Sequence, residues 1–198
     1  MKGPRMPFVR QLHAVVKACE EELGYRPLIV AEDLGESTPE LAAFVKNSGF
    51  PGMRVMQFAF DGDDANIHLP HNYSSNTVAY TGTHDNNTLL GFVWECDDAS
   101  RRDMLDYCGF TDLNWNRPES YEAIIRTLMR SVADLAILPI QDVLGFGGDC
   151  RMNTPGRPDG NWSFRVTGEQ INSIDRYRFS RMNWLYGRRP ALKNDTKA

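Results

Sequence analysis

The chain has 198 residues, of which 41% are hydrophobic and 24% are charged, and its formal net charge is −4. These are the values of an ordinary globular protein with one core or two small domains. The mild acidity, without a block of Lys and Arg before Arg188-Arg189, argues against a nucleic-acid-binding surface. No apolar stretch approaches the roughly 18 residues that a membrane span requires. We therefore expect neither nucleic acid nor a membrane as a partner.

Cysteine usage indicates a reducing compartment. The four cysteines are far apart and form no CxxC pair, which is typical of free thiols rather than of disulfides or metal ligands. The stretch before Arg10 contains two prolines and no apolar core of a signal peptide. We therefore expect a cytoplasmic protein without a bound metal.

Apolar periodicity and capping signals predict helices and strands in alternation. Thr38 followed by Pro39 is typical of a helix start. Further helices are predicted over residues 8–23, 86–96, 98–108, 118–132 and 169–185, and strands over residues 28–33, 53–60, 77–83 and 135–140. The first of these strands is apolar until Glu32-Asp33, so we expect it to be buried on both faces. One domain over residues 1–187 and a disordered tail over residues 188–198 complete the prediction.

Strands that alternate with helices indicate a parallel sheet with helical crossovers. Each predicted strand ends in polar side chains, which are Glu32-Asp33, Gln57 to Asp61, His84-Asp85 and Gln141-Asp142. In a parallel sheet these ends lie on one rim, which is where (β/α) barrels carry their active sites. A doubly wound sheet would also bind ligands there. However, no glycine-rich loop opens a helix after a strand, so nucleotide binding is disfavoured.

The polar side chains at this rim suit a carbohydrate. Carboxylates and amides match the paired hydroxyls of sugars, and aromatic faces such as those of Tyr73, Tyr80 and Trp162 suit sugar rings. Two carboxyl groups about 5–5.5 Å apart would support glycosyl transfer with retention. The sequence has no Gly-x-Ser-x-Gly elbow and no thiol near a strand end, so acyl transfer is unsupported.

Four long motifs resemble one known family. They are AEDLGESTPEL (31–41), GFPGMRVMQFAF (49–60), LPHNYSSNTVAYTGTHDNNTLLG (69–91) and LPIQDVLGFGGDCRMNTPGRPDGNW (138–162). In this order they look like the 4-α-glucanotransferases, also called amylomaltases or disproportionating enzymes, of glycoside hydrolase family 77. The resemblance implies a (β/α)8 TIM barrel that acts on maltooligosaccharides and on starch or glycogen-type α-1,4-glucans. Such an enzyme passes a glucan segment to another glucan or to glucose, with retention and without a cofactor.

Carried over position by position, the resemblance implies roles for four residues. Glu32 corresponds to the general acid/base, which protonates the leaving glycosidic oxygen and then deprotonates the acceptor hydroxyl. Asp85 corresponds to a further catalytic carboxylate, which holds sugar hydroxyls and stabilises the oxocarbenium-like transition state. His84 looks like a hydroxyl-binding residue of the same subsite, and Asn153 resembles a residue that contacts the donor sugar.

Other residues of the same motifs are open to two interpretations. Asp33 and Asp142 are expected to orient neighbours or to cap helices. Five more are expected either to contact the substrate or to support the site: Gln57, Asn72, Gln141, Arg157 and Trp162.

The resemblance covers only about strands five to eight of such a barrel. The family's nucleophile is an Asp on an earlier strand, and no RxDH-type motif that would carry it occurs in this sequence. We therefore expect half a barrel, with about four parallel strands and two unpaired edges, that is inactive without its N-terminal half. Two alternatives stay open, a non-catalytic glucan-binding module and a metal-dependent hydrolase that uses His84 and Asp85.

Overall fold

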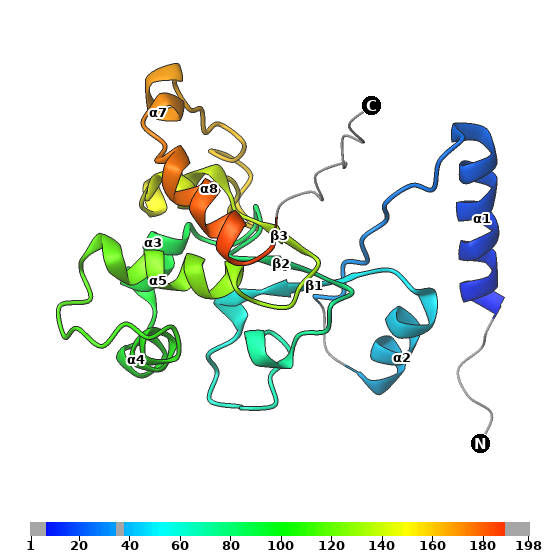
Figure 1. Cartoon of the computed structure of the whole chain (residues 1–198), viewed down its shortest axis with the longest axis horizontal. Coiled ribbons are helices and arrows are strands. Elements are labelled where there is room, and N and C mark those ends of the chain that lie inside the picture. Colours follow the sequence, from blue (N-terminus) through cyan, green and yellow to red (C-terminus); the bar gives the residue numbers. More distant parts are fainter. Residues whose placement is uncertain (1–6, 35–37, 189–198) are drawn as a thin grey trace, which may run out of the picture.

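The computed structural model describes residues 7–34 and 38–188 and consists of a small parallel sheet flanked by helices (Figure 1). The strands are β1 (Gly52–Val55), β2 (Thr77–Tyr80) and β3 (Leu135–Ile137). The α-helices are α1 (Pro7–Leu23), α2 (Pro39–Ser48), α3 (Leu89–Glu95), α4 (Asp98–Tyr107), α5 (Pro118–Met129), α6 (Ile140–Leu144), α7 (Gly168–Asn172) and α8 (Arg176–Leu185). Short 3-10 helices cover Met56–Phe58, Pro70–Asn72 and Gly148–Cys150.

The three strands run parallel in the order β1-β2-β3. Gly52 pairs with Thr77 at one end of the β1–β2 ladder, and Tyr80 pairs with both Val55 and Ile137 at the other. Helices α3, α4 and α5 form the crossover between β2 and β3, as a parallel connection requires. The predicted parallel α/β sheet is confirmed, and the carboxyl ends of its strands share one rim.

The segment predicted as the first strand is only marginally part of this sheet. Ala31 forms a single parallel bridge with Gly52, and its N–H donates to the carbonyl of Pro51 over 2.9 Å. Leu28 is 78% exposed, so the expected burial on both faces is wrong. The segment lies at the edge of the sheet, where β1 covers one side and no described strand covers the other.

The other strands are shorter than predicted, because the chain turns soon after each of them. β1 ends at the 3-10 helix Met56–Phe58, and β2 ends before a turn that carries His84 and Asp85. After β3, Pro139 has no N–H to donate, and α6 begins directly behind it. Gln141 and Asp142 therefore lie on a helix and not, as predicted, at the end of a strand.

Side-chain caps define where several helices begin. The Thr38 hydroxyl accepts a hydrogen bond from the Leu41 N–H over 3.2 Å, which confirms the predicted start of α2. The single helix predicted over residues 169–185 is divided into α7 and α8. The reason is a second cap, because the Asp175 carboxylate accepts from the Arg178 N–H over 2.9 Å and starts a new helix.

The hydrophobic core lies between the sheet and helices α3, α4 and α5, and Met182 of α8 closes it. Its most deeply buried members come from the sheet region and from all three of these helices: Met56, Ala79, Leu89, Val93, Met104, Ile124 and Leu128. Because β2 and the start of α3 both contribute to this core, the turn between them is held at both ends.

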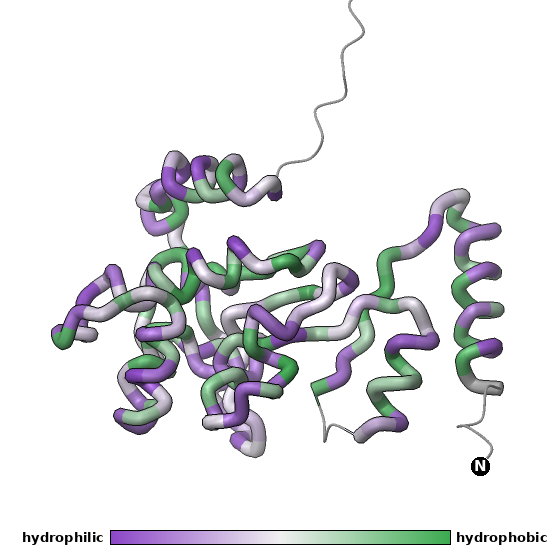
Figure 2. Tube along the Cα trace, turned by 60° about the horizontal axis from the view of Figure 1, so that its bottom comes forward, coloured by the Kyte–Doolittle hydropathy of each residue, from purple (hydrophilic) through white to green (hydrophobic). Residues whose placement is uncertain are grey.

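α1 stands apart from this core and contacts α2 (Figure 1). His13 Nε2 lies 2.8 Å from the carbonyl oxygen of Ser48, and Val16 is buried. Hydrophobic and hydrophilic segments alternate along this helix (Figure 2), but Val15 is 59% exposed and Leu23 is 49% exposed. The predicted amphipathic helix is present, and much of its apolar side is uncovered by the described residues. None of the described helices combines the length and the apolar character needed to cross a bilayer.

A buried arginine joins α3 to α4. Arg101 is 7% exposed, and its guanidinium stacks over the Trp115 ring with 4.2 Å between Cζ and the ring centroid. It also pairs with Asp98 over 2.5 Å. The same guanidinium donates to three carbonyl oxygens at the end of α3, those of Val93, Trp94 and Cys96. The last carbonyls of a helix lack a backbone N–H partner within it, and only that of Val93 has a further donor here, the Cys96 thiol, so Arg101 caps α3 from the neighbouring helix.

Arg188 is anchored rather than solvated. Its guanidinium donates to the carbonyl oxygens of Met129, Ser131 and Ala133 over 2.6, 2.9 and 2.9 Å. These carbonyls belong to the end of α5 and to the turn that follows it. The expected disordered tail therefore does not begin at Arg188, and the rest of it, residues 189–198, lies outside the described part of the chain.

The loop between β1 and β2 is held by a neutral histidine. His68 Nδ1 accepts a hydrogen bond from the Val55 N–H at the end of β1 over 3.1 Å. Burial, followed by the positive charge of Arg54, lowers the pKa of His68 below its ordinary value of 6.5. A ring nitrogen accepts a hydrogen bond only when it is unprotonated, so folding favours the neutral ring.

The unfolding free energy is therefore expected to fall as the pH drops below about 6.5, because the unfolded chain then binds the His68 proton more readily. This contribution is complete above that pH and is lost below it. Urea unfolding at about pH 7.5 and pH 5.5 measures the difference, and His68→Gln should reduce it. His71→Gln, at an exposed position of the same loop, should retain it. An equal pH difference in the His68 variant and the parent chain would contradict the assignment.

Candidate active site

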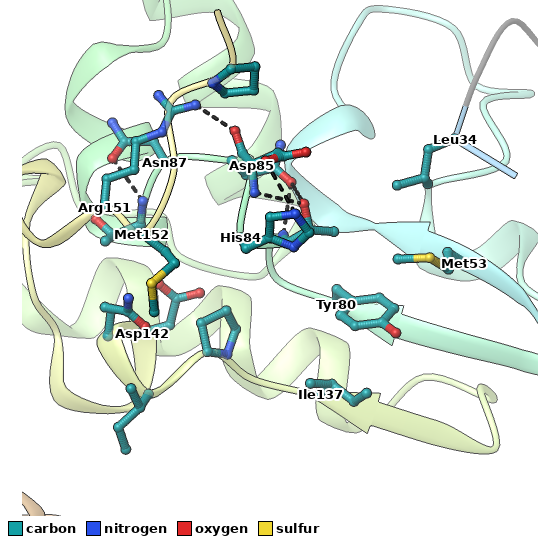
Figure 3. Close-up of a pocket in the computed structure, with 18 of the residues that line it drawn as sticks. Leu34, Met53, Tyr80, His84, Asp85, Asn87, Ile137, Asp142, Arg151 and Met152 are labelled. Atoms are coloured by element: carbon teal, nitrogen blue, oxygen red, sulfur yellow. Dashed lines mark hydrogen bonds and ion pairs between the residues drawn. The ribbon is translucent and has the colours of Figure 1, made fainter. Parts of the chain in front are cut away.

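A pocket of about 770 Å³ opens at the rim where the strands end. It is lined by the segment that follows Ala31, by the turn after β2, and by residues between β3 and Trp162. In Figure 3, His84 and Asp85 lie in the middle of this pocket, between residues of the sheet and of the later loop. Of the predicted site residues, Glu32, His84 and Asp85 line it. A pocket of this size accommodates a small organic ligand.

Asp85 is held by the loop that follows α6. Asn153 Nδ2 donates to Asp85 Oδ1 over 2.5 Å, and His84 Nε2 lies 3.3 Å from the same oxygen. Arg151 Nη2 donates to the backbone carbonyl of Asp85 over 2.5 Å, and the Asn153 N–H donates to the His84 carbonyl over 3.1 Å. The Asp85 side chain stays 48% exposed. The structure thus joins three predicted residues into one unit whose carboxylate is still accessible.

The turn after β2 is supported from beneath. Asn86 Oδ1 accepts hydrogen bonds from the N–H and the hydroxyl of Thr83 over 2.8 and 2.9 Å. Gln57 is 8% exposed, and its Nε2 donates to the Asn87 carbonyl over 2.8 Å. A Cβ atom on Gly82 would lie 2.5 Å from this nitrogen, so glycine allows the amide to reach the turn. Gln57 therefore supports the turn and is not among the residues that line the pocket.

Glu32 is positioned by its neighbour Asp33. Asp33 Oδ1 accepts from the Met53 N–H over 2.7 Å, and Oδ2 pairs with Arg54 Nη1 over 2.9 Å. Asp33 thereby fastens the segment to β1, as predicted, while Glu32 lines the pocket. Burial, followed by the negative charge of Glu32, raises the pKa of Tyr80. The Glu32 carboxylate and the Tyr80 phenol are thus near enough to interact, and both residues line the pocket.

Asp142 is 1% exposed and connects α6 to the start of α3. Its Oδ1 accepts from the Leu89 N–H over 2.7 Å, and its Oδ2 accepts from the Thr81 hydroxyl over 2.5 Å. Burial raises the pKa of Asp142, although both hydrogen bonds act in the opposite direction. Helix α3 begins at Leu89, directly after Thr88, and not at residues 86–87 as predicted. The reason is that Asp142 accepts from the Leu89 N–H and the Thr88 hydroxyl accepts from the Gly91 N–H, so both side chains cap the first turn. The predicted capping role of Asp142 is confirmed.

Asn72 and Arg157 are not among the residues that line the pocket. Asn72 Nδ2 donates to the carbonyls of Asp64 and Asn66, each over 2.9 Å, and so closes its own loop. The Arg157 N–H donates to the Thr154 carbonyl over 3.2 Å. The predicted contact of Gln57, Asn72 and Arg157 with a substrate stays a prediction, and their location outside the pocket lining does not support it.

Arg151 is absent from the predicted site residues, although it lines the pocket and holds Asp85. Its Nε also donates to the Asn153 carbonyl over 2.7 Å, so it fixes both partners. The only feature of the sequence that could have pointed to Arg151 is its position two residues before Asn153 in the same motif. Gln141, left open above, lines the pocket and donates to the Cys150 carbonyl over 3.2 Å.

This arrangement suits proton transfer next to a ring that develops positive charge. The Glu32 carboxyl group is exposed in the pocket and can exchange a proton with a bound oxygen. The Asp85 carboxylate can accept hydrogen bonds from hydroxyl groups and stabilise positive charge. Within residues 7–34 and 38–188, no group of three or more His, Cys, Asp and Glu side chains could hold a metal ion.

Comparison with known proteins assigns the chain to a family. A family model described as 4-alpha-glucanotransferase, of glycoside hydrolase family 77, matches residues 5–171. The 4-alpha-glucanotransferase of Synechocystis sp. is 44% identical over 177 residues, which are 87% of this chain and 34% of that protein. A chloroplastic/amyloplastic 4-alpha-glucanotransferase of Solanum tuberosum is 44% identical over 138 residues, which are 70% of this chain and 23% of that protein.

A solved structure shows the same fold. The amylomaltase from Streptococcus agalactiae in complex with acarbose matches with a TM-score of 0.77 and 32% identity, over 89% of this chain and 35% of that one. The similarity confirms the predicted α/β architecture of the (β/α)8-barrel family. This chain spans about a third of the length of the Synechocystis relative. From its sequence and its fold, the chain belongs to the 4-α-glucanotransferases of glycoside hydrolase family 77.

Proposed function

We propose that this chain is the C-terminal part of a catalytic barrel that transfers segments of α-1,4-glucans to an acceptor glucan or to glucose, with retention. The main support is the pocket in which Glu32 and Asp85 face the same space. Donors would be maltooligosaccharides and starch or glycogen-type glucans, since the exposed Asp85 carboxylate, held by Asn153, lines the pocket with the aromatic Trp162 and can accept hydrogen bonds from sugar hydroxyls. A cytoplasmic location stays a prediction, because the family includes a chloroplastic/amyloplastic relative.

In this proposal Glu32 acts twice on the same oxygen position. It first donates a proton to the glycosidic oxygen while the bond to C1 breaks and an Asp nucleophile attacks C1. The Glu32 carboxylate then removes the proton of the acceptor hydroxyl, which displaces the nucleophile and restores the α configuration. Asp85 accepts hydrogen bonds from ring hydroxyls, and its charge stabilises the oxocarbenium-like transition state.

We infer that the nucleophile belongs to a polypeptide segment outside this sequence. Asp61, which follows the predicted second strand, is not among the residues that line the pocket. Its carboxylate accepts from the Asp63 N–H over 3.1 Å, and hydrogen bonding led by Asn66 lowers its pKa. Asp142 lines the pocket, but its two oxygens are bound to Leu89 and Thr81.

The edges of the sheet are suited to receive the N-terminal half of a barrel. On β3, Leu135 and Ile137 are each 39% exposed, and at the opposite edge Leu28 is 78% exposed. Unpaired strand edges with apolar side chains associate readily with further strands, and a closed barrel has no such edges. The proposal therefore requires a second half that pairs with both edges.

A disproportionation assay tests the proposal. The purified chain is incubated with maltotriose, alone and after refolding with the N-terminal part of the Synechocystis relative, and glucose and longer products are measured. We expect no product from the chain alone and both products from the complemented protein. Turnover by the chain alone would show that the nucleophile lies within it.

The assay also separates the alternative function. A chain that binds maltoheptaose but gives no product in either form would be a glucan-binding module. A chain that neither binds maltoheptaose nor turns over maltotriose after complementation would contradict both functions. Isothermal titration calorimetry provides the binding constant for this comparison.

A further inference from the structure

Trp162 has a backbone conformation that large side chains avoid. Its φ is 59°, and in the described part of the chain it is the one non-glycine residue with a positive φ. The left-handed region is unfavourable for a bulky L-residue. Such a conformation persists where surrounding contacts impose it, and it recurs at sites that hold a ligand.

Hydrogen bonds on both sides of Trp162 impose this conformation. Its N–H donates to the Met152 carbonyl over 2.8 Å, and its carbonyl accepts from Arg165 Nη1 over 3.1 Å. Just before it, Asn161 Oδ1 accepts from the Thr154 N–H over 2.8 Å. These bonds fold the loop back on itself, so that its end is fixed against its beginning.

The same loop places the indole beside the candidate catalytic turn. Met152, which binds the Trp162 backbone, lies between the two residues that hold Asp85. The centroids of the Trp162 and His84 rings are 5.0 Å apart with 37° between the ring planes. Trp162 lines the pocket, yet it is 55% exposed. The indole is therefore held in a fixed place but left uncovered.

From this geometry we propose that Trp162 is the platform on which a glucosyl ring of the substrate stacks, next to the ring held by Asp85. This inference rests on the proposed glucan-transferring function and adds a specificity-determining residue to it. The apolar C–H face of a pyranose packs on an aromatic face, while its hydroxyls turn toward polar groups such as the pocket-lining Asp85. The strained backbone is the means by which a loop presents a large ring at this position.

The test compares variants that separate the ring from the backbone. Trp162→Phe keeps an aromatic face, whereas Trp162→Asn and Trp162→Gly remove it but tolerate a positive φ. Titration calorimetry of the full chain with maltoheptaose should give a roughly tenfold higher Kd for the Asn and Gly variants. The Phe variant should stay within about threefold of the parent. The Tm of the Gly variant should equal or exceed that of the parent, because glycine adopts this φ without strain.

Each of the other possible outcomes contradicts one part of the proposal. If Asp85→Asn weakens binding and Trp162→Gly does not, the glucan site stands and the stacking role of Trp162 is wrong. If the Phe variant binds maltoheptaose as weakly as the Gly variant, an aromatic face at this position does not explain the affinity. A Tm that falls in the Asn and Gly variants with an unchanged Kd would make Trp162 a structural residue. If neither the parent chain nor the protein complemented with the N-terminal half binds maltoheptaose, the proposed glucan site fails, and the stacking role fails with it.

Discussion

Glu32→Gln is expected to lower the rate of maltotriose disproportionation in the complemented protein by about 10²- to 10⁴-fold. Glutamine keeps the size and shape of the side chain, but it can neither donate a proton to the glycosidic oxygen nor remove one from the acceptor. Asp33, and not Glu32, fastens this segment to β1. Folding should therefore be unaffected, and the Tm should match that of the parent chain. Release of glucose from maltotriose measures the rate.

The matched control for this substitution is Glu20→Gln. Glu20 is exposed on α1 and is not among the residues that line the pocket. The same chemical change there should leave the rate within about twofold of the parent, as expected for a surface position. A Glu32 variant that retains more than about a tenth of the parental rate would remove Glu32 from the role of acid and base.

Arg101→Met should cost about 3 kcal/mol of unfolding free energy, which is a large fraction of the stability of an ordinary domain. Methionine fills much of the same space, but it leaves the carbonyl oxygens of Trp94 and Cys96 without their donor and leaves that of Val93 with only the weak Cys96 thiol donor. It also removes the cation from the Trp115 ring. Asp98 adds little to this loss, because its side chain is 90% exposed. Urea unfolding followed by circular dichroism measures the difference.

Arg102→Met provides the comparison within the same helix. Arg102 is exposed, so the same substitution there should change the unfolding free energy by no more than about 0.5 kcal/mol. If the two variants unfold at the same urea concentration, the cap that Arg101 provides to α3 does not contribute to stability.

The parallel direction of the strands could be predicted from the sequence better than their extent. Alternating apolar runs and helices predicted the parallel sheet, and the Thr38-Pro39 pair predicted the start of α2. The run that begins at Leu28 is as apolar as that of a central strand, yet Leu28 is 78% exposed. The hydrophobicity of a segment indicates how much its burial would stabilise the fold. It does not indicate whether a neighbouring strand is present to bury it.

The site was predictable where its residues are adjacent in the sequence. Glu32 and the pair His84-Asp85 end apolar runs, so their place at one rim followed from the parallel order. Asp142 binds the N–H of Leu89, a backbone group 53 positions away, and no local pattern reveals such a contact. Gln57 illustrates the opposite case, because an amide that supports a turn from beneath has the same sequence signature as one that faces the pocket.

The anchoring of Arg188 determines where a shortened version of this chain can end. A polypeptide that stops at Gly187 would keep α8 complete, and on secondary structure alone it would be a natural boundary. It would also leave the carbonyls of Met129, Ser131 and Ala133 without the guanidinium that binds them, and the end of α5 would be prone to fraying. A polypeptide that ends at Arg188 keeps all three of these hydrogen bonds. Expression trials and carboxypeptidase trimming should therefore treat residue 188 as the shortest C-terminus.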